Sequence, residues 1–282
     1  MKSVQRTFAI VALTTTLVSC GVRNSPAITP MLTATPPRVS ATTATYPLLS
    51  DILNAYDDGS SAYTLDLSLA NAQTRLDDLQ NDRIQYFATH HIPVDNSLWA
   101  APIAQDGLAI ITHPNMSLSN ITLDQLRQIY NGKMTTLADD DGVGQHLIVF
   151  SREQGSSIRA ELERMVMGNR RTTANARLAF TDEQMVKLVS ETEGAIGYVS
   201  WGFLNSLQNP NVIVLPVENI TPTLTTIYDH VYPLPNTIYM IGKSEPQDGA
   251  RTLMGWIQSQ EGQKVVMSRY VPLLMLTSPQ AN

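Results

Sequence analysis

The histidine pair and the clustered aspartates have the spacing that comes nearest to a metal site. His90 and His91 are adjacent, and neighbouring side chains on a strand point to opposite faces, so the pair is poorly placed to hold one ion. The run Asp139-Asp140-Asp141-Gly142 is similar to a calcium loop, but Phe150 stands where that pattern needs a glutamate. We interpret the aspartates as a solvated turn. The histidine pair keeps two interpretations, packing or ligand contact, and we expect no metal site.

Motifs for nucleophilic or hydrolytic catalysis are absent from the sequence. There is no Gly-x-Ser-x-Gly, Ser-x-x-Lys, phosphate-binding Walker loop or His-Glu-x-x-His, and the chain has a single cysteine, Cys20. No pair of acids stands out as a hydrolytic pair. The sequence therefore predicts a protein that is not an enzyme and needs no cofactor.

The charge balance argues against nucleic acid as a partner. The 282 residues contain 19 Lys and Arg against 25 Asp and Glu, a net charge of −6, without any basic block. A nucleic-acid backbone is held mainly by rows of cations. An acidic balance still allows one small anion to bind.

The first residues have the pattern of a secretory signal. Lys2 and Arg6 precede the apolar stretch 8–18, which is too short to span a bilayer as a helix. Leu17-Val18-Ser19-Cys20 is similar to the lipobox at which bacterial lipoproteins are cleaved and acylated. We predict a signal peptide over residues 1–19 and lipidation of Cys20. An incidental cysteine after an ordinary signal peptide and a buried core thiol are the alternatives. Cleavage removes two cations and no acid, so the net charge becomes −8.

Residues 20–45 form the predicted tether. The segment is rich in Thr, Pro, Ala and Ser and has almost no large apolar side chains with which to bury a core. Fully extended, such a segment reaches roughly 80 Å. A lipid-anchored domain held just off a membrane is the geometry that it predicts.

From residue 46 onward the sequence alternates between helical and strand patterns. Helical spacing of apolar residues covers 48–56, 123–130, 156–167, 182–190, 250–260 and 262–268. Strand-like runs cover 63–67, 84–87, 108–112, 147–150, 196–199, 212–215 and 238–241. Thr122 with Gln125 predicts a capping box. This alternation predicts sheets covered by helices, the α/β class.

Two extended segments that contain proline, 99–105 and 232–235, are candidate hinges. If the chain crosses at both, residues 46–102 and 233–282 form lobe 1 and residues 103–232 form lobe 2. Small-ligand sites favour the cleft between such parts.

Several runs along this region resemble one family. They are Asp106–Ile111, Pro114-Asn115, Ile121–Lys133, Ser151–Ser156, Gly194–Tyr198, Tyr232–Leu234 and Gly262–Leu273. In this order they are similar to the phosphate-binding lipoproteins of bacterial phosphate ABC importers. The resemblance covers about residues 45–273 and implies a two-lobed periplasmic-binding-protein fold of type II, with an oxyanion held between the lobes.

The resemblance implies that Arg152, Gly155 and Ser156 grip the anion. A guanidinium offers paired donors to tetrahedral oxygens, and the start of a helix presents unpaired N–H groups. The alternative is that Arg152 pairs with Glu153 or another acid, and that Ser156 is a plain N-cap.

Other positions depart from the family pattern or match it loosely. Ser157-Ile158 replaces the usual Gly-Thr, so Ser157 adds a hydroxyl where Ile158 loses one. Thr45 falls in the family's first binding loop, although an ordinary loop threonine fits equally well. In the second binding loop, at residues 71–76, the expected serine is Ala72.

The acid that the family often carries after a serine is missing, because the chain has Thr89-His90-His91 at that place. A carboxylate there discriminates protonated phosphate from sulfate, because the carboxylate and a fully ionised oxyanion both bring only lone pairs. His90 can instead donate to an oxyanion, and Thr89 is its neighbour in the implied site.

The resemblance implies an extracytoplasmic, lipid-anchored and monomeric binding protein that delivers phosphate to a membrane permease driven by a separate ATPase. Two alternatives stay open. One is a lipoprotein that has lost its ligand and acts as a sensor or interaction module. The other is an importer receptor for sulfate, molybdate, tungstate or a phosphonate.

Overall fold

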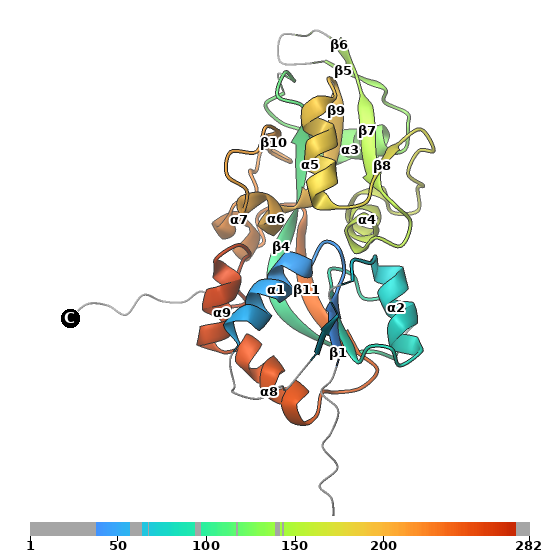
Figure 1. Cartoon of the computed structure of the whole chain (residues 1–282). Helices are drawn as coiled ribbons and strands as arrows, with labels where there is room; N and C mark the ends of the chain where they lie inside the picture. The colour runs from blue at the N-terminus through green and yellow to red at the C-terminus, as the bar shows by residue number, and fades with distance from the viewer. Residues whose placement is uncertain are drawn as a thin grey trace, which may run out of the picture. The chain divides into compact units, whose positions relative to one another are not determined.

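One long strand, β4 (Trp99–Thr112), runs through both halves of the sheet (Figure 1). The computed structural model describes residues 38–56, 64–66, 68–93, 97–116, 118–138, 142 and 144–274. The first half of β4 pairs with β11 (Pro235–Gly242), and its second half pairs with β9 (Ala195–Ser200) and β10 (Ile213–Leu215), all antiparallel. We call the β11 side lobe 1 and the β9 side lobe 2.

Lobe 1 has the strand order β2-β1-β3-β11-β4. Strand β1 (Arg38–Ala41) lies parallel between β2 (Thr64–Asp66) and β3 (Tyr86–Thr89). The helices of lobe 1 are α1 (Tyr46–Ala55), α2 (Ala72–Gln80), α8 (Asp248–Ile257) and α9 (Gln260–Met267).

Lobe 2 continues the sheet in the order β4-β9-β7-β8, with β10 on β4. Strands β7 (Ile148–Arg152) and β8 (Arg177–Ala179) are parallel, and β5 (Thr136–Ala138) and β6 (Gly144–His146) form a separate hairpin-like pair. The helices of lobe 2 are α3 (Leu123–Tyr130), α4 (Ser157–Leu162), the π-helical η1 (Glu163–Met167), α5 (Asp182–Glu191), α6 (Trp201–Asn205) and α7 (Leu224–Tyr228). The predicted α/β class is confirmed.

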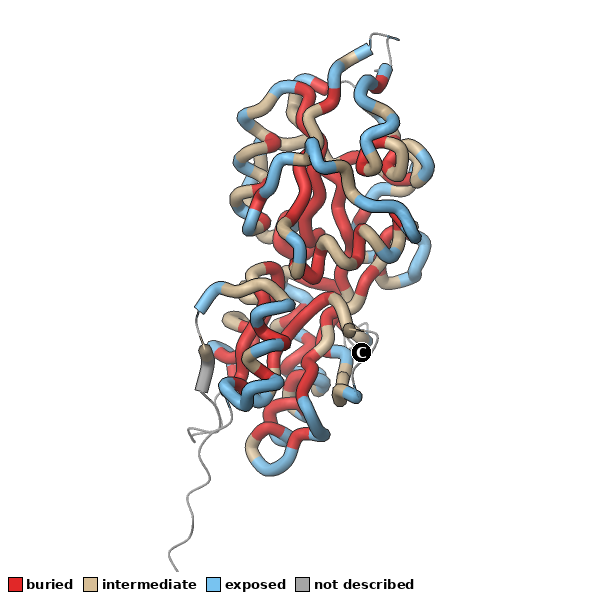
Figure 2. The backbone as a smooth tube through the Cα atoms, turned by 90° about the vertical axis from the view of Figure 1, so that its right-hand side faces the viewer, coloured by how far each residue is buried: buried red, intermediate tan, exposed pale blue. Residues whose placement is uncertain are grey.

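Each lobe has its own hydrophobic core, seen as buried backbone in Figure 2. Ile103 and Ala104 pack in the core of lobe 1, whereas Leu108 and the residues after it pack in the core of lobe 2. Strand β4 therefore passes from the core of lobe 1 to the core of lobe 2 between Ala104 and Leu108. This is a few residues beyond the crossing point that the sequence predicts between 102 and 103. The candidate hinge segment 99–105 lies in β4, and the segment 232–235 ends at the first residue of β11. Strands β4 and β11 pair with each other, and Gly107 lies opposite Pro235.

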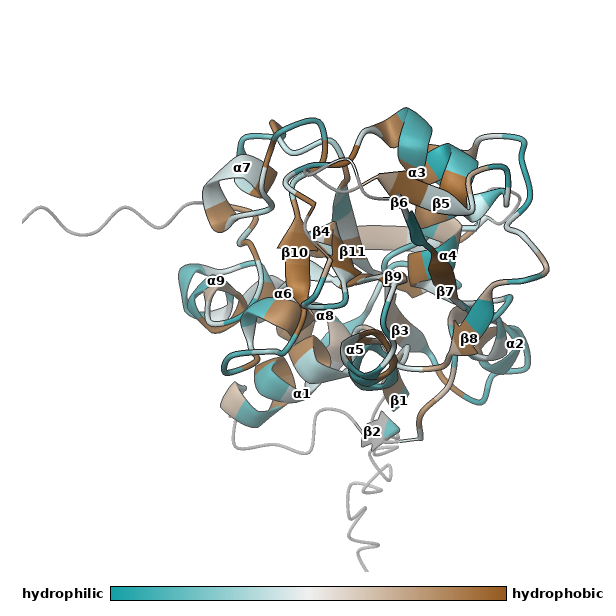
Figure 3. Ribbon diagram, turned by 90° about the horizontal axis from the view of Figure 1, so that it is seen from above, coloured by the Kyte–Doolittle hydropathy of each residue, from teal (hydrophilic) through white to brown (hydrophobic). Residues whose placement is uncertain are grey.

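Local sequence signals explain where several helices begin. The capping box predicted at Thr122 and Gln125 is present at the start of α3. Asn71 and Thr181 cap α2 and α5 through their side chains. Apolar and polar stretches alternate along the helices in Figure 3, so that one face of each helix can cover the sheet. The predicted helix 156–167 is divided, because α4 changes into η1 at Glu163.

The tether predicted over residues 20–45 overlaps the folded domain at its C-terminal end. Residues 38–41 form β1, and Val39, Ala41, Thr42 and Ala44 are buried. The prediction is wrong for residues 38–45 because small side chains, rather than the large apolar ones we looked for, fill this part of the core. Residues 20–37, including Cys20, lie outside the described residues.

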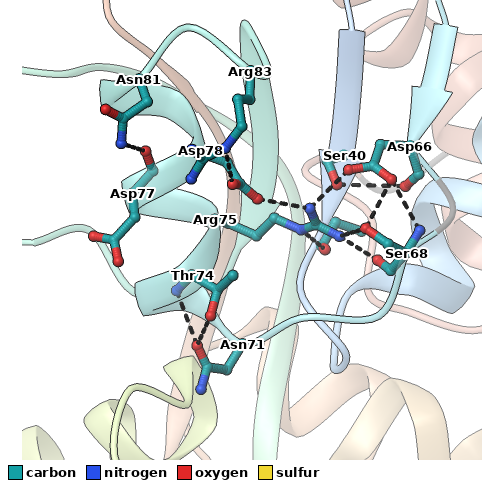
Figure 4. A network of polar contacts seen from close by, with 11 residues as sticks. Ser40, Asp66, Ser68, Asn71, Thr74, Arg75, Asp77, Asp78, Asn81 and Arg83 are labelled. Atoms are coloured by element: carbon teal, nitrogen blue, oxygen red, sulfur yellow. Dashed lines mark hydrogen bonds and ion pairs between the residues drawn. The ribbon is translucent and has the colours of Figure 1, made fainter.

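Residues 71–76 form the start of α2 instead of the turn that the family pattern predicts. The helix is tied to the sheet by Arg75, which is 1% exposed (Figure 4). Its guanidinium donates to the Ala41 carbonyl at 3.1 Å, to Asp66 at 2.8 Å and to Asp78 at 3.1 Å, and also to the carbonyl and hydroxyl of Ser68. We call this the Arg75 network. It fixes the N-terminus of α2, which faces lobe 2.

Candidate functional site

The loop that joins β7 to α4 carries four of the residues predicted to contact a ligand: Arg152, Gly155, Ser156 and Ser157. Ser156 is the N-cap of α4, and its Oγ accepts a hydrogen bond from the Arg159 N–H at 3.4 Å. Ser157 is the first residue of the helix. Its hydroxyl is buried and has no hydrogen-bond partner among the described residues.

Gly155 is the point at which this loop touches lobe 1. Its φ of +92° lies in the region that favours glycine, and an added Cβ would lie 2.8 Å from the Cβ of Gln73. The Gly155 carbonyl accepts a hydrogen bond from the Gln73 N–H at 3.1 Å. The loop and the start of α2 are therefore held together across the lobes by backbone contact that needs a glycine.

Arg152 ends β7 and is fully buried. Its Nη1 donates to Asp182 Oδ1 at 2.8 Å, and its Nη2 donates to the Phe180 carbonyl at 2.8 Å and to Thr43 Oγ1 of lobe 1 at 3.1 Å. Its Nε has no hydrogen-bond partner among the described residues, since Glu153 Oε2 lies 3.6 Å away. The guanidinium therefore bridges the lobes, and its Nε makes only a long ion pair with Glu153 and no hydrogen bond within the described residues.

Asp182, the first residue of α5, is the acid that pairs with Arg152. Burial raises the pKa of Asp182 from 3.8 to about 6, and the nearby charge of Arg152 only partly offsets this. Its second oxygen, Oδ2, has no partner among the described residues. The pairing of Arg152 with another acid, and the capping role of Ser156, match the alternative interpretation of these residues.

The two predicted threonines use their hydroxyls locally. Thr45 Oγ1 donates to the Ala88 carbonyl at 2.7 Å and accepts from the Thr42 N–H at 3.0 Å. Thr89 Oγ1 exchanges 3.3 Å contacts with the backbone of His91. Both side chains therefore shape the turns before α1 and after β3.

His90 is buried against Asp106 of β4. Its Nε2 lies 2.9 Å from Asp106 Oδ2, which also accepts from the Ser200 hydroxyl at 2.6 Å. The other oxygen, Oδ1, accepts from the N–H groups of Gly107 and Gly202 at 2.8 and 2.9 Å. The Nδ1 of His90 has no partner among the described residues.

His91 forms a second bridge between the lobes. Its Nδ1 lies 2.8 Å from Glu161 Oε1 of α4, and Arg164 donates to the other carboxylate oxygen at 2.6 Å. Burial opposes ionisation of Glu161, but the hydrogen bonds from His91 and Arg164 outweigh it and lower its pKa.

Two cavities open between the lobes. The first, of about 250 Å³, is lined by Gly155, Ser156 and Ser157 together with the start of α2 and His91. The second, of about 340 Å³, is lined by His90, His91, Glu161 and Arg164 and by the first residues of β11. Thr45, Thr89 and Arg152 are completely buried. The structure thus brings the β7–α4 loop and the histidine pair to one cleft.

Sequence reasoning missed Thr43, Asp106 and Asp182. Asp182 follows the N-cap Thr181, so it has the pattern of an ordinary acid in the first turn of a helix. Asp106 lies within a family run, which gave no hint that four donors converge on it. The partners of buried charges depend on chain segments far apart in sequence.

Comparison with known proteins places the domain in a family. The profile described as "PBP superfamily domain" matches residues 32–261. The chain belongs to this superfamily. The fold of this PBP-superfamily domain also resembles solved structures. One is from Clostridium perfringens and is described as a phosphate ABC transporter substrate-binding protein with bound phosphate. Its TM-score is 0.76 at 21% identity, and the match covers 86% of this chain and 100% of that one. An ABC-type phosphate transport receptor from Vibrio cholerae has a TM-score of 0.69 at 21% identity, covering 83% and 98%.

Curated relatives of low sequence identity are also phosphate-binding proteins. The phosphate-binding protein PstS of Bacillus subtilis is 22% identical over 173 residues, which are 61% of this chain and 56% of that protein. The PstS of Borreliella burgdorferi is 22% identical over 172 residues, 58% of this chain and 61% of that protein. The match thus spans little more than half the length of either relative. Membership of the PBP superfamily and the two-lobed fold, both implied by the resemblance, are confirmed.

Two features are absent from the described residues. No helix among them is long and apolar enough to cross a membrane. Nor do the described ranges contain a group of three or more His, Cys, Asp or Glu side chains that could hold a metal ion.

Proposed function

We propose that this PBP-superfamily domain is a solute-binding receptor that captures a small oxyanion, phosphate, between its lobes. The observation that carries the proposal is Arg152, a fully buried guanidinium at the lobe boundary whose Nε is unused. The unpartnered hydroxyl of Ser157 lies on the same loop and helix start. Two buried donors that lack a hydrogen-bond acceptor favour a ligand that brings acceptor oxygens.

The charges around Arg152 determine how an anion is held. Asp182 competes with the anion for the guanidinium, but its raised pKa means that a nearby negative charge favours its protonated form. The anion then meets one guanidinium and neutral donors from Ser156, Ser157 and the helix start beside Gly155. Such neutral donors can hold a dianion without a positive net charge of the protein.

The names of the relatives support a transport role. We propose that the protein is anchored through Cys20 on the extracytoplasmic side of a bacterial membrane, acts as a monomer, and delivers its ligand to a permease driven by a separate ATPase. Binding without chemical conversion of the ligand is part of this proposal. Hinge bending at β4 and β11 would open and close the cleft.

A second candidate function is a sensor or interaction lipoprotein that has lost its ligand. The observation that favours it is the Arg152–Asp182 ion pair at 2.8 Å, which occupies the guanidinium internally. A receptor for sulfate, molybdate, tungstate or a phosphonate is the remaining alternative, because the family's discriminating acid is absent.

Calorimetry on the purified protein tests these functions, with phosphate, sulfate, molybdate and methylphosphonate titrated in turn at pH 6 and pH 8. We expect micromolar or tighter binding of phosphate. Arg152→Ala should weaken it roughly ten- to a hundredfold, from the loss of one charge-assisted contact of about 1.5–3 kcal/mol. Arg83→Ala is the matched control, because Arg83 is exposed and pairs with Asp78 in lobe 1, away from the cleft lining. Silence across all four anions would favour the sensor.

A further inference from the structure

The second cavity between the lobes contains polar groups that an oxyanion at the β7–α4 loop does not explain. It has a volume of about 340 Å³, within the range of small-molecule sites. Three segments line it: the end of β3 with His90 and His91, one face of α4 and η1 with Glu161 and Arg164, and β11 from Pro235 to Tyr239. We call it the hinge pocket.

Asp106 fixes the protonation pattern of His90 in this pocket. Four donors converge on the two oxygens of Asp106: His90 Nε2, the Ser200 hydroxyl and the N–H groups of Gly107 and Gly202. A carboxylate that receives four donors is acceptor-only, so the proton of the imidazole lies on Nε2. Nδ1 then accepts a hydrogen bond when the ring is neutral and donates one when the ring is charged. His90 is 2% exposed, and this atom has no partner among the described residues.

Asn236 is the second unexplained group. It pairs with Asp106 across β11 and β4, lines the hinge pocket and is 6% exposed. Neither Oδ1 nor Nδ2 of its amide has a hydrogen-bond partner among the described residues. A buried amide left in this state is costly, so its retention beside a second unpartnered atom indicates a ligand that supplies both a donor and an acceptor.

The charged residues of the hinge pocket are already paired. Glu161 is held by His91 and Arg164, so neither the acid nor its partners require a charged ligand group. The groups that lack partners are a ring nitrogen and an amide. Hydroxyl groups match them best, because a hydroxyl can donate to Nδ1 and can accept from Nδ2.

The hinge pocket adjoins the proposed oxyanion position. His91 lines both cavities. Ser157 and Glu161 are four residues apart on α4, so they share a face and lie about 6 Å apart along its axis. A phosphoryl group and a terminal hydroxyl that are joined through an ester oxygen and three carbon atoms span about that distance.

We propose that the natural ligand is an organic phosphate, a phosphoryl group that carries a short hydroxylated substituent, with the substituent bound by His90 and Asn236 in the hinge pocket. This inference rests on the proposed function, because the phosphoryl group occupies the oxyanion position near Arg152 and Ser157. Inorganic phosphate then fills only part of the site.

The test is calorimetry with glycerol 3-phosphate, inorganic phosphate and glycerol on the wild-type protein and on Asn236→Leu. We expect glycerol 3-phosphate to bind about ten- to thirtyfold more tightly than phosphate, from two added hydrogen bonds. Asn236→Leu should remove most of that advantage and leave phosphate affinity within about twofold. Thermal unfolding checks the fold of the variant, which loses two unpartnered polar atoms and keeps the number and branching of the side-chain heavy atoms.

The other outcomes separate the two proposals. Phosphate binding that equals or exceeds that of glycerol 3-phosphate overturns the organic ligand and leaves oxyanion capture standing. An advantage of glycerol 3-phosphate that survives in Asn236→Leu overturns the placement in the hinge pocket. Binding of neither compound overturns both proposals. The wild-type comparison is decisive even if the variant does not fold.

Discussion

Two arginines are buried in the part of the chain that the structure describes, and they differ in how completely their donors are used. Arg75 in lobe 1 donates to two carboxylates, two carbonyls and a hydroxyl, which uses its full set of donors. Arg152 at the lobe boundary leaves its Nε without a partner among the described residues. A complete set of partners makes the first arginine a structural clamp. An incomplete set makes the second a candidate for ligand binding.

The acids that pair with the two arginines differ in the same direction. Burial opposes ionisation of Asp66, but hydrogen bonds from Ser68 and the charge of Arg75 outweigh it and lower the pKa. At Asp182 burial wins, and the pKa rises to about 6. The ionised form of Asp66 is thus favoured beside Arg75, whereas protonation of Asp182 or binding of an anion can weaken the ion pair between Asp182 and Arg152.

The largest expected effect comes from breaking the clamp. Arg75→Met keeps a long side chain but removes the only cation paired with Asp66 among the described residues, leaves Asp78 with Arg83 alone and takes donors from two backbone carbonyls. This should cost about 3–5 kcal/mol of the free energy of unfolding. Urea unfolding measures the loss. Phosphate affinity of the folded fraction should stay within about twofold, because Arg75 does not line the cleft. A variant with native stability but weakened binding would contradict the division of roles.

The next effect is the pH dependence from Asp182. Between about pH 4 and pH 6 the native carboxyl keeps a proton that the unfolded chain has released, so the free energy of unfolding falls as pH rises through this window. A pKa change from 3.8 to about 6 corresponds to roughly 3 kcal/mol, fully lost above pH 6. Asp182→Asn should abolish this contribution.

Urea unfolding of the wild type and Asp182→Asn at several pH values isolates the effect, since the other acids, including Asp66 with its lowered pKa, are common to both proteins. The difference between the two stabilities should change across pH 4–6 and stay constant above it. A difference independent of pH would show that Asp182 is ionised in the native state throughout.

The contrast between the two arginines also marks what could be predicted from the sequence. The α/β class and the capping box at Thr122 follow from local patterns, and they are confirmed. The two crossings of the chain between the lobes stay a prediction. Helix α2 was missed because its buried positions are only Arg75, Leu76 and Leu79, too few for a helical apolar repeat. Strand β1 was missed because it fills the core with small residues.

Of the candidate site, the sequence predicted only the residues of the loop between β7 and α4. The resemblance selected Arg152, Gly155, Ser156 and Ser157, and the structure places them together at the start of α4. Which acid pairs with Arg152, and which carboxylate fixes His90, depends on contacts between distant strands. No local pattern encodes such partners, because an acid in a first helical turn has the same sequence whether it faces solvent or a buried guanidinium.

The smallest expected effect sharpens the comparison within one loop. Ser156 has a partner, since it caps α4, whereas the neighbouring Ser157 hydroxyl is buried with none among the described residues. Ser156→Ala should cost about 1 kcal/mol of the free energy of unfolding, as loss of an N-cap does. Ser157→Ala removes a hydroxyl that no described group satisfies, so stability should be unchanged or slightly higher, and phosphate should bind several-fold more weakly. Urea unfolding and calorimetry on the two variants give the comparison. If Ser157→Ala instead lowers stability and leaves binding intact, the unpartnered donors of this cleft are internal features of the fold, and the distinction drawn from Arg75 and Arg152 does not extend to ligand capture.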